Sequence, residues 1–294
     1  MNIVVTGSEG FVATHFRQRM WDRFGNDHKI ICVDKKLGRD LSDARTIQWL
    51  KEVCPNPDFV ISFAGTCSTP RGFTHPEEAF HDNAEAMLNV LQYCVGTKAQ
   101  LIHTSTIKAQ PADEGMYTPY GLTKLFGEML VFEWMKSFGL KAIVNRPGTI
   151  YGPGQHGSAE SGWLGWFITA ALEGKTVTVN GDGNQIRDIL FVEDYVDLVF
   201  SQMVGFDEYM AKAKGKAYVV GGGNDNALSL NEAIQVIQRY LPLTVQYGPT
   251  RLGDNRRLVS PNIVSFVRLW KPKTSARKGI GDTIKFYKEN KDNL

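Results

Sequence analysis

The turn at Thr6–Ala13 constrains the fold of this chain more than any other part of the sequence. It follows the apolar run Asn2–Thr6 and precedes a helical pattern. Gly7 permits a tight turn, Gly10 lets the backbone approach a pyrophosphate, and Ala13 takes the third position of the fingerprint, where helix packs on strand. The N-terminus of that helix would face the anion. The turn therefore predicts a strand–turn–helix unit that binds a dinucleotide.

The second apolar run, Lys29–Asp34, ends in an acidic residue 27 positions after Gly7. A carboxylate at this place accepts hydrogen bonds from an adenosine ribose and repels a 2′-phosphate, so Asp34 predicts NAD as the cofactor. Lys35 and Lys36 would partly offset the discrimination against NADP. The alternative is an ordinary turn glycine followed by a surface aspartate.

Apolar runs in the first half of the chain are rich in Ile and Val and continuous, as in strands buried on both faces. Helical patterns lie between them, among them Ala84–Cys94 and a long one from about Tyr120 to Phe138. This alternation predicts an α/β fold with a doubly wound parallel sheet, the Rossmann arrangement. The expected strands are Asn2–Thr6, Lys29–Asp34, Phe59–Phe63, Leu101–Ser105 and Ala142–Arg146.

The sequence changes character after Arg146, where glycines and a proline make a loop-rich passage. A helix containing Trp163, Trp166 and Phe167 is expected next, followed by strands at Thr176–Asn180 and Ala217–Val220. Ser229 and Glu232 form a capping-box signature that predicts a later helix start. Apart from Ala217–Val220, these elements predict a smaller C-terminal α/β domain. The basic residues Lys271, Lys273, Arg277 and Lys278 are interpreted as a solvated face.

Charge and apolar patterning exclude several classes of partner. The formal net charge of +2, from 33 basic and 31 acidic residues, gives no electrostatic sign of a nucleic acid or a membrane surface. No apolar run reaches the roughly 18 residues of a membrane span. Met1–Val5 begins a strand and lacks the features of a signal peptide, so a cytoplasmic protein is expected.

The four cysteines lack the spacing of metal ligands, so no metal site is expected. We expect reduced, mostly buried thiols, with a catalytic thiol as an alternative for Cys67 alone. The four are Cys32, Cys54, Cys67 and Cys94.

Tyr120 and Lys124 stand four residues apart, which places their side chains on one face of a helix. An ammonium beside a phenol is expected to lower the pKa of the tyrosine from about 10 toward neutrality, as alcohol–ketone chemistry requires. Thr106 follows the fourth expected strand, at the sheet edge where ligands bind. The alternatives are a solvated i,i+4 contact and an ordinary threonine at a strand end.

Taken together, these features resemble the extended short-chain dehydrogenase/reductase family of nucleotide-sugar epimerases and dehydratases. The resemblance covers nearly the whole chain. Its matching pieces are Thr6–Ala13, Asp34, Asp40-Leu41, Phe63-Ala64-Gly65, Ser105-Thr106, Pro119-Tyr120 with Lys124, Arg146 with Tyr151–Gly154, Gly181–Gly183 with Arg187-Asp188, and Arg251 with Gly253-Asp254.

The resemblance implies roles for these residues. Tyr120 would be the acid–base, Lys124 would lower its pKa and hold a ribose of NAD, and Thr106 would orient the reacting hydroxyl. Asp40 and Leu41 would lie beside the adenine. The cofactor-binding residues implied are Gly7, Gly10, Phe11, Val12, Asp34, Asp40, Leu41, Phe63, Ala64, Gly65, Tyr120 and Lys124.

Arg187 and Arg251 look like the residues that clamp the diphosphate of a nucleotide sugar, because a guanidinium pairs bidentately with phosphate oxygens. A surface ion pair is the alternative for each. Asp254 would bind the nucleotide ribose or organise Arg251. The substrate-binding residues implied are Thr149, Gln155, Trp163, Arg187, Arg251 and Asp254, although Trp163 would serve equally as a core aromatic.

Within the family, the segments around Gln155, Trp163, Gly181–Asp188 and Gly221–Leu230 are most similar to the CDP-paratose 2-epimerase branch. Thr149 replaces an Asn of UDP-galactose 4-epimerases, which also favours the 2-epimerase branch.

Three departures from the family pattern matter. The segment between Thr106 and Tyr120 is shorter than usual, so the substrate could differ. Cys67 stands where 4-epimerases have a lysine that contacts the cofactor. Ile107 and Lys108 replace the Asp-Glu of the dehydratases, which argues against dehydration.

The resemblance implies epimerisation by transient oxidation of a sugar hydroxyl with bound NAD. A UDP-sugar 4-epimerase, an NAD(P)-dependent ketoreductase or dehydrogenase, and a non-catalytic NAD-binding sensor remain as alternatives.

Residues 1–149 and about 185–222 would form the NAD-binding domain, and about 150–184 and 223–294 the nucleotide-sugar-binding domain. A homodimer through the helix of Tyr120 is expected, with which Phe132, Trp134 and Met135 are compatible.

Overall fold

The computed structural model describes residues 1–113, 115–261 and 270–290 of the 294-residue chain. The chain divides into two compact units, each built from several separate segments. The first unit comprises Met1–Gln110, Thr118–Arg146 and Leu198–Tyr218, and the second comprises Pro111–Tyr117, Pro147–Asp197 and Val219–Leu294.

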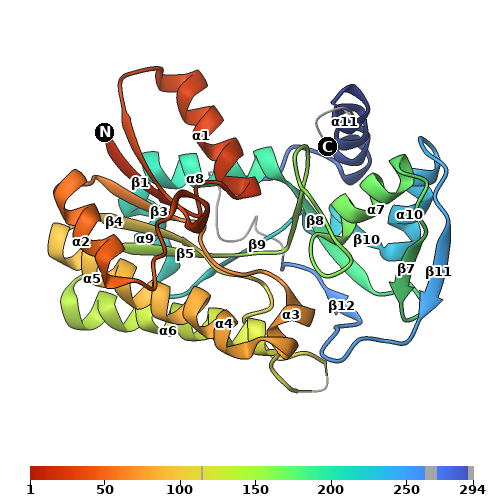
Figure 1. Ribbon diagram of the computed structural model, residues 1–294, viewed down its shortest axis with the longest axis horizontal. Coiled ribbons are helices and arrows are strands. Elements are labelled where there is room, and N and C mark those ends of the chain that lie inside the picture. Colours follow the sequence, from red (N-terminus) through yellow and green to blue (C-terminus); the bar gives the residue numbers. More distant parts are fainter. Residues whose placement is uncertain (114, 262–269, 291–294) are drawn as a thin grey trace. The chain divides into compact units, whose positions relative to one another are not determined.

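A parallel sheet forms the centre of the first unit (Figure 1), with strand order β2-β1-β3-β4-β5-β9. The chain adds β2 on one side of β1 and β3 on the other, so the topological switch point lies between β1 and β3. In such sheets, ligands bind beyond the carboxyl ends of the strands at this point. The strands are β1 (Asn2–Thr6), β2 (Lys29–Val33), β3 (Phe59–Ser62), β4 (Gln100–Thr104), β5 (Ala142–Pro147) and β9 (Tyr218–Val220).

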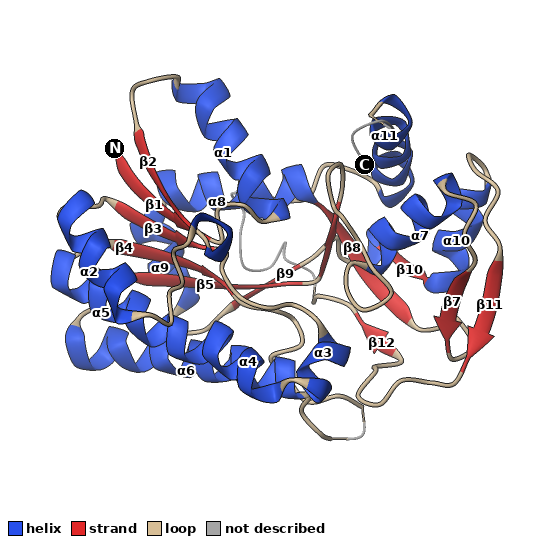
Figure 2. Ribbon diagram, viewed as in Figure 1, coloured by secondary structure: helices blue, strands red, loops and turns tan. Residues whose placement is uncertain are grey.

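Helices cover both faces of this sheet, and Figure 2 shows α2, α5 and α6 on one side and α1 on the other. The ring of Phe16 in α1 lies 5.6 Å from Phe63 and 5.3 Å from Phe200 of α8, between ring centroids. The helices are α1 (Phe11–Phe24), α2 (Ala44–Val53), α3 (Thr69–Thr74), α4 (Pro76–Phe80), α5 (Ala86–Thr97), α6 (Pro119–Phe138), α8 (Val192–Val204), which continues from the second unit, and α9 (Phe206–Ala213).

The predicted doubly wound parallel sheet is confirmed, and its predicted strands begin and end within one residue of the observed ones. The long predicted helix is α6. It begins after Thr118, whose hydroxyl accepts a hydrogen bond from the Gly121 N–H at 3.1 Å. The helix predicted at Ala84–Cys94 is α5, but it starts later because a π-helical turn, His81–Glu85, precedes it.

Within the part of the chain that the structure describes, the second unit contains small sheets and the helices α7, α10 and α11. Strand β8 (Ile186–Phe191) pairs in parallel with β6 (Thr149–Tyr151) and β12 (Arg257–Leu258), and antiparallel with β10 (Ala227–Ser229). Strand β7 (Val177–Asn180) pairs in parallel with β11 (Val245–Gly248). Figure 1 shows α7 (Trp163–Leu172) and α10 (Leu230–Gln238) beside this pair, and α11 (Ala276–Glu289) completes the unit.

The core of the second unit joins these elements through apolar contacts. Leu164 and Ile168 of α7, Ile237 of α10 and Ile280 of α11 are buried in one cluster. The predicted capping box is present, since Ser229 and Glu232 bond each other's backbone N–H groups at the start of α10.

Two of the five junctions between the units follow Arg146 and Asp197. The first of these boundaries lies near the expected one at residue 149, and the second lies beyond the expected 185. That the two units bind NAD and a nucleotide sugar, respectively, stays a prediction. Of the helices in the described residues, none has the length and apolar character to span a membrane.

The four cysteines are reduced thiols. Cys54 and Cys94 are buried and Cys32 is partly buried, but Cys67 is exposed, so the expectation of mostly buried thiols is wrong for that residue.

Candidate functional site

The glycine turn after β1 packs directly on the backbone that follows β3. Gly7 has φ +66°, and its N–H donates to the Val33 carbonyl at 2.8 Å. A Cβ at Gly7 would lie 2.7 Å from the Ala64 nitrogen and 3.0 Å from the Phe63 carbonyl carbon. Glycine is therefore required both by the backbone angle and by this approach. The turn brings Gly7, Phe63 and Ala64 together at the switch point of the sheet.

The N-terminus of α1 is suited to an anion. Gly10 is its N-cap, no side chain caps the helix, and its first turn carries no acidic residue. The amide groups at a helix start carry partial positive charge and attract phosphate. Phe11 and Val12 form the first turn and are half-buried. This arrangement fits the pyrophosphate of a dinucleotide.

Asp34 lies beside the glycine turn, where its carboxylate accepts hydrogen bonds from the N–H groups of Glu9 at 3.1 Å and Lys36 at 2.9 Å. A carboxylate has further lone pairs that remain available to a ribose. Lys35 pairs with Asp82 at 2.5 Å and Asp40 at 3.2 Å. Lys35 is thus occupied, which weakens the expectation that it offsets discrimination against NADP.

Asp40 and Leu41 lie in the loop before α2. The Asp40 carboxylate accepts hydrogen bonds from both the N–H and the hydroxyl of Ser42. The Leu41 side chain is buried in the core of the first unit, and its carbonyl accepts a hydrogen bond from Asn89 at 2.8 Å. The place of these residues beside an adenine stays a prediction.

The candidate catalytic residues of the first unit are buried together. Thr106, Tyr120 and Lys124 are 8%, 6% and 5% exposed, respectively. A hydrogen bond joins the Thr106 hydroxyl to the Tyr120 phenol. The Lys124 ammonium donates to the carbonyl of Thr104, at the end of β4, at 2.8 Å. The structure thus brings the three residues into one cluster at the carboxyl end of β4.

The expected fall in the pKa of Tyr120 is wrong for this structure. Burial raises the pKa of the phenol above its ordinary value, and the Thr106 hydrogen bond lowers it only in part. Burial also lowers the pKa of Lys124 to about 8. The i,i+4 spacing correctly predicts that the two residues share a helix face, but desolvation by burial is the largest cause of both pKa shifts.

Cys67 lies close enough to both residues of this pair to contribute to raising the pKa of Tyr120 and of Lys124. It is exposed, so it lies at the accessible side of the cluster.

Asn83 is a residue that the sequence reasoning missed. It is 3% exposed, and its side-chain N–H donates to the Thr123 hydroxyl at 3.1 Å, whereas its Oδ1 has no partner. A Cβ at Gly65 would lie 2.4 Å from this oxygen and 3.4 Å from Lys124 Nζ. The unpaired oxygen and the Lys124 ammonium thus both lie near Gly65. The π-helical turn that directs Asn83 inward leaves no trace in apolar periodicity.

In the second unit, Arg187 and Asp254 form an ion pair. Arg187 is 7% exposed, its Nη2 bonds the Asp254 carboxylate, and its Nη1 donates to the Ile186 carbonyl at 2.7 Å. Arg251 donates to the Ala159 carbonyl at 2.8 Å and, through Nε and Nη2, to the Asn180 amide oxygen at 3.0 Å. Asp254 therefore organises Arg187 and not Arg251.

The other three candidates of the second unit differ in their surroundings. Thr149 lies on β6 and is half-buried. Gln155 donates to the Ile150 carbonyl at 2.8 Å, and its buried Oε1 has no partner. Trp163 opens α7 and packs against the apolar core, with its ring 5.4 Å from that of Phe167. Trp163 thus has the contacts of a core aromatic.

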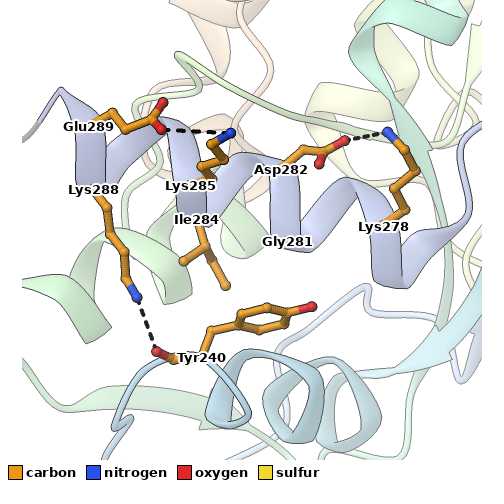
Figure 3. Close-up of a pocket in the computed structure, with 8 residues that line it drawn as sticks. All are labelled: Tyr240, Lys278, Gly281, Asp282, Ile284, Lys285, Lys288 and Glu289. Carbon is orange, nitrogen blue, oxygen red and sulfur yellow. Dashed lines mark hydrogen bonds and ion pairs between the residues drawn. The ribbon is translucent and has the colours of Figure 1, made fainter.

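A cavity of about 550 Å³ lies between Tyr240 and one face of α11 (Figure 3). None of the predicted site residues lines it. Its lining residues are Tyr240, Lys278, Gly281, Asp282, Ile284, Lys285, Lys288 and Glu289.

Comparison with known proteins adds to this geometry. A profile of the "NAD dependent epimerase/dehydratase family" matches residues 3–221. The CDP-paratose 2-epimerase of Salmonella typhi is 27% identical over 77% of this chain and 70% of that protein. The UDP-glucose 4-epimerase of Mycolicibacterium smegmatis is 26% identical over 98% of this chain and 99% of that protein.

Solved structures share the fold. The UDP-glucose 4-epimerase of Thermus thermophilus, in complex with NAD, has a TM-score of 0.82 at 23% identity, over 98% of this chain and 99% of that one.

Proposed function

Because the chain belongs to the NAD-dependent epimerase/dehydratase family, we propose that it is a nucleotide-sugar epimerase that works by transient oxidation of a sugar hydroxyl. The chain is an NAD-dependent enzyme of the nucleotide-sugar epimerase and dehydratase type. The observation that carries the proposal is the buried hydrogen bond between Thr106 and Tyr120, with Lys124 one helical turn further on.

Tyr120 is the proposed acid–base group. Its phenolate oxygen would take the proton of a sugar hydroxyl that Thr106 orients. It would return a proton when the ketone is reduced to the alcohol again. Lys124 contributes a cation within the same buried cluster. When bound, NAD supplies the hydride acceptor, and its positively charged ring favours phenolate. The ketone would rotate within the site before hydride returns to its opposite face, so the conversion is redox-neutral.

The residues of the first unit fit NAD. The turn at Gly7 and Gly10 would hold the pyrophosphate, Asp34 the adenosine ribose, and Gly65 with Asn83 the part of the cofactor nearest Lys124. The fit rests on the uncapped N-terminus of α1 and on the unpaired Asn83 oxygen.

We propose a CDP-paratose-type substrate with epimerisation at carbon 2. The likeness to the CDP-paratose 2-epimerase supports this choice, as does Thr149, three positions after Arg146, where 4-epimerases carry Asn. Arg187 and Arg251 would bind the diphosphate. Arg187 is already buried and held by Asp254, which pre-organises its guanidinium.

A UDP-sugar 4-epimerase is the second candidate, and its support is the 26% identity to a UDP-glucose 4-epimerase over nearly the whole of both chains. A dehydratase is disfavoured because Ile107 and Lys108 follow Thr106 in place of acidic residues.

The proposal is tested by identifying the nucleotide released from the purified protein and offering CDP-, UDP- and GDP-sugars without added cofactor. Redox-neutral conversion of one sugar is expected, and NMR of the product identifies the inverted carbon. Strict dependence on added NAD(P)H would instead assign a ketoreductase. Tight NAD binding without turnover of any sugar would assign a sensor.

A further inference from the structure

Three consecutive residues at the end of β4 are each tied to helix α6. The helix residues concerned stand four positions apart, so they share one helix face. The ties join the Thr104 carbonyl to Lys124 Nζ, the Ser105 hydroxyl to the Glu128 carboxylate, and the Thr106 hydroxyl to the Tyr120 phenol. The catalytic candidates thus belong to a larger set of connections that includes Glu128.

Glu128 is a fully buried charge. Its exposure is 0%, and Arg146 of β5 holds it with Nε at 2.9 Å from both carboxylate oxygens and Nη2 at 2.6 Å from Oε2. Buried ion pairs often contribute little net stability, because desolvation of the charges offsets their attraction. Stability alone is therefore a weak reason for a carboxylate at this place.

The Glu128 carboxylate favours the charged, ammonium form of Lys124. Burial lowers the pKa of Lys124 to about 8, and Glu128 opposes that fall. Cys67, from the loop after β3, acts in the same sense as Glu128. His103 of β4 also faces Lys124, and burial together with the ammonium holds its pKa well below the ordinary value, so the imidazole is neutral. The buried phenol of Tyr120 is neutral at pH 7 as well.

We propose that Glu128 is a positioning residue for the acid–base step, which keeps Lys124 in its ammonium form and fixes the end of β4 that carries Thr106. Arg146 and Ser105 hold the carboxylate in place for this task. The inference rests on the proposed roles of Tyr120 and Lys124.

The test compares three variants with the parent protein. Glu128→Gln removes the carboxylate and leaves Arg146 unopposed. The double variant Glu128→Gln with Arg146→Gln removes both charges. Glu133→Gln changes an exposed glutamate on the same helix and is the matched control. The side-chain Nζ of Lys124 is titrated by NMR, and kcat is measured against pH.

We expect the pKa of Lys124 to fall by about one unit in Glu128→Gln, by less in the double variant, and not at all in Glu133→Gln. The alkaline limb of the kcat profile should move to lower pH in the same order. Loss of packing alone would lower kcat at every pH and leave the limb where it is, and this result would overturn the inference.

The NMR titration needs no turnover, so it separates this inference from the proposed function. The Lys124 pKa values of the variants could follow the expected order in a protein that converts no sugar nucleotide. That result would contradict the proposed epimerase activity and would support the proposed effect of Glu128 on the charge of Lys124. If Glu128→Gln fails to fold, Glu128→Asp is measured in its place. It retains the charge, so the Lys124 pKa should stay near that of the parent while kcat falls, because the shorter side chain shifts Ser105 and Thr106. A Lys124 pKa moved by a full unit in Glu128→Asp would contradict the proposal.

Discussion

Tyr120 and Lys124 are both almost fully buried, and burial shifts their pKa values in opposite directions. Sequence spacing correctly predicts that they share a helix face, because spacing is a local property of the helix. Desolvation depends on tertiary packing, such as the approach of α3, where a Cβ at Gly72 would lie 3.0 Å from the Tyr120 nitrogen. The sequence therefore identifies these residues but not their ionisation.

Tyr120→Phe removes the proposed acid–base oxygen and keeps the ring. We expect kcat to fall by roughly 10²- to 10⁴-fold, the range for loss of a positioned acid–base group. NAD binding, measured by isothermal titration, should persist. Tyr117→Phe is the control, since Tyr117 is exposed. Equal turnover in the Tyr120 variant and the parent would contradict the assignment.

The pH dependence of activity should follow Lys124. With a pKa of about 8, the side chain is a cation below this pH and a neutral amine above it. If the reaction requires the cation, kcat falls above about pH 8. In Lys124→Arg the guanidinium stays charged, so the alkaline limb should disappear even though kcat is lower throughout. Persistence of the limb in Lys124→Arg would assign it to another group.

Among the elements, the long helices, the central strands and β7, expected at Thr176–Asn180, were predictable, while the other short strands of the second unit were not. β1, β3 and α6 carry strong local signals, namely continuous apolar runs and an N-cap at Thr118. β12 has only two residues and exists because it pairs with β8. The Arg187–Asp254 pair depends on the fold around β8, so spacing alone could not reveal it.

The turn between β1 and α1 can be tested by comparing two glycines with positive φ. Gly7→Ala should reduce the free energy of unfolding by more than Gly25→Ala does, because a Cβ at Gly7 meets Ala64 whereas one at Gly25 meets nothing within 4 Å. Strain of this kind costs about 1–3 kcal/mol per residue. Urea denaturation measures both variants. Equal losses would show that the contact with Ala64 adds nothing.

The start of α6 can be tested through its cap. Thr118→Ala removes the hydroxyl that accepts from Gly121 N–H, and should cost about 0.5–2 kcal/mol of stability. It should also lower kcat, since Tyr120 lies in the same turn. Ser275→Ala removes the corresponding cap of α11. This control should lose similar stability in thermal unfolding and keep its kcat. An equal loss of kcat in both variants would show that the α6 cap has no specific effect on catalysis.

At the scale of the whole molecule, α6 presents an apolar face to solvent. Leu122, Phe126 and Met129 are exposed, and the ring of Phe126 lies 5.9 Å from that of Phe80. Phe132, Trp134 and Met135, which the sequence indicated for a dimer, are partly buried against the core of the first unit. We propose that a homodimer forms through the exposed residues of α6.

Met129→Glu should weaken such a dimer, because a buried charge at an interface without a partner is costly. Sedimentation velocity should show a dimer for the parent and a shift toward monomer for the variant. Val204→Glu, at an exposed apolar residue of α8, is the control and should leave the parent mass unchanged. A monomeric parent would exclude the dimer outright.

The polypeptide passes between the two units five times, after residues 110, 117, 146, 197 and 218. No single cut separates them: we expect that a fragment ending at residue 110, 117, 146 or 197 would lack parts of both units, and that one ending at 218 would hold the first unit with only part of the second. Recombination between relatives would have to respect all five junctions at once to exchange one unit intact. A new sugar specificity in such a chain should therefore arise through substitutions within the existing units, and not through the exchange of a whole unit.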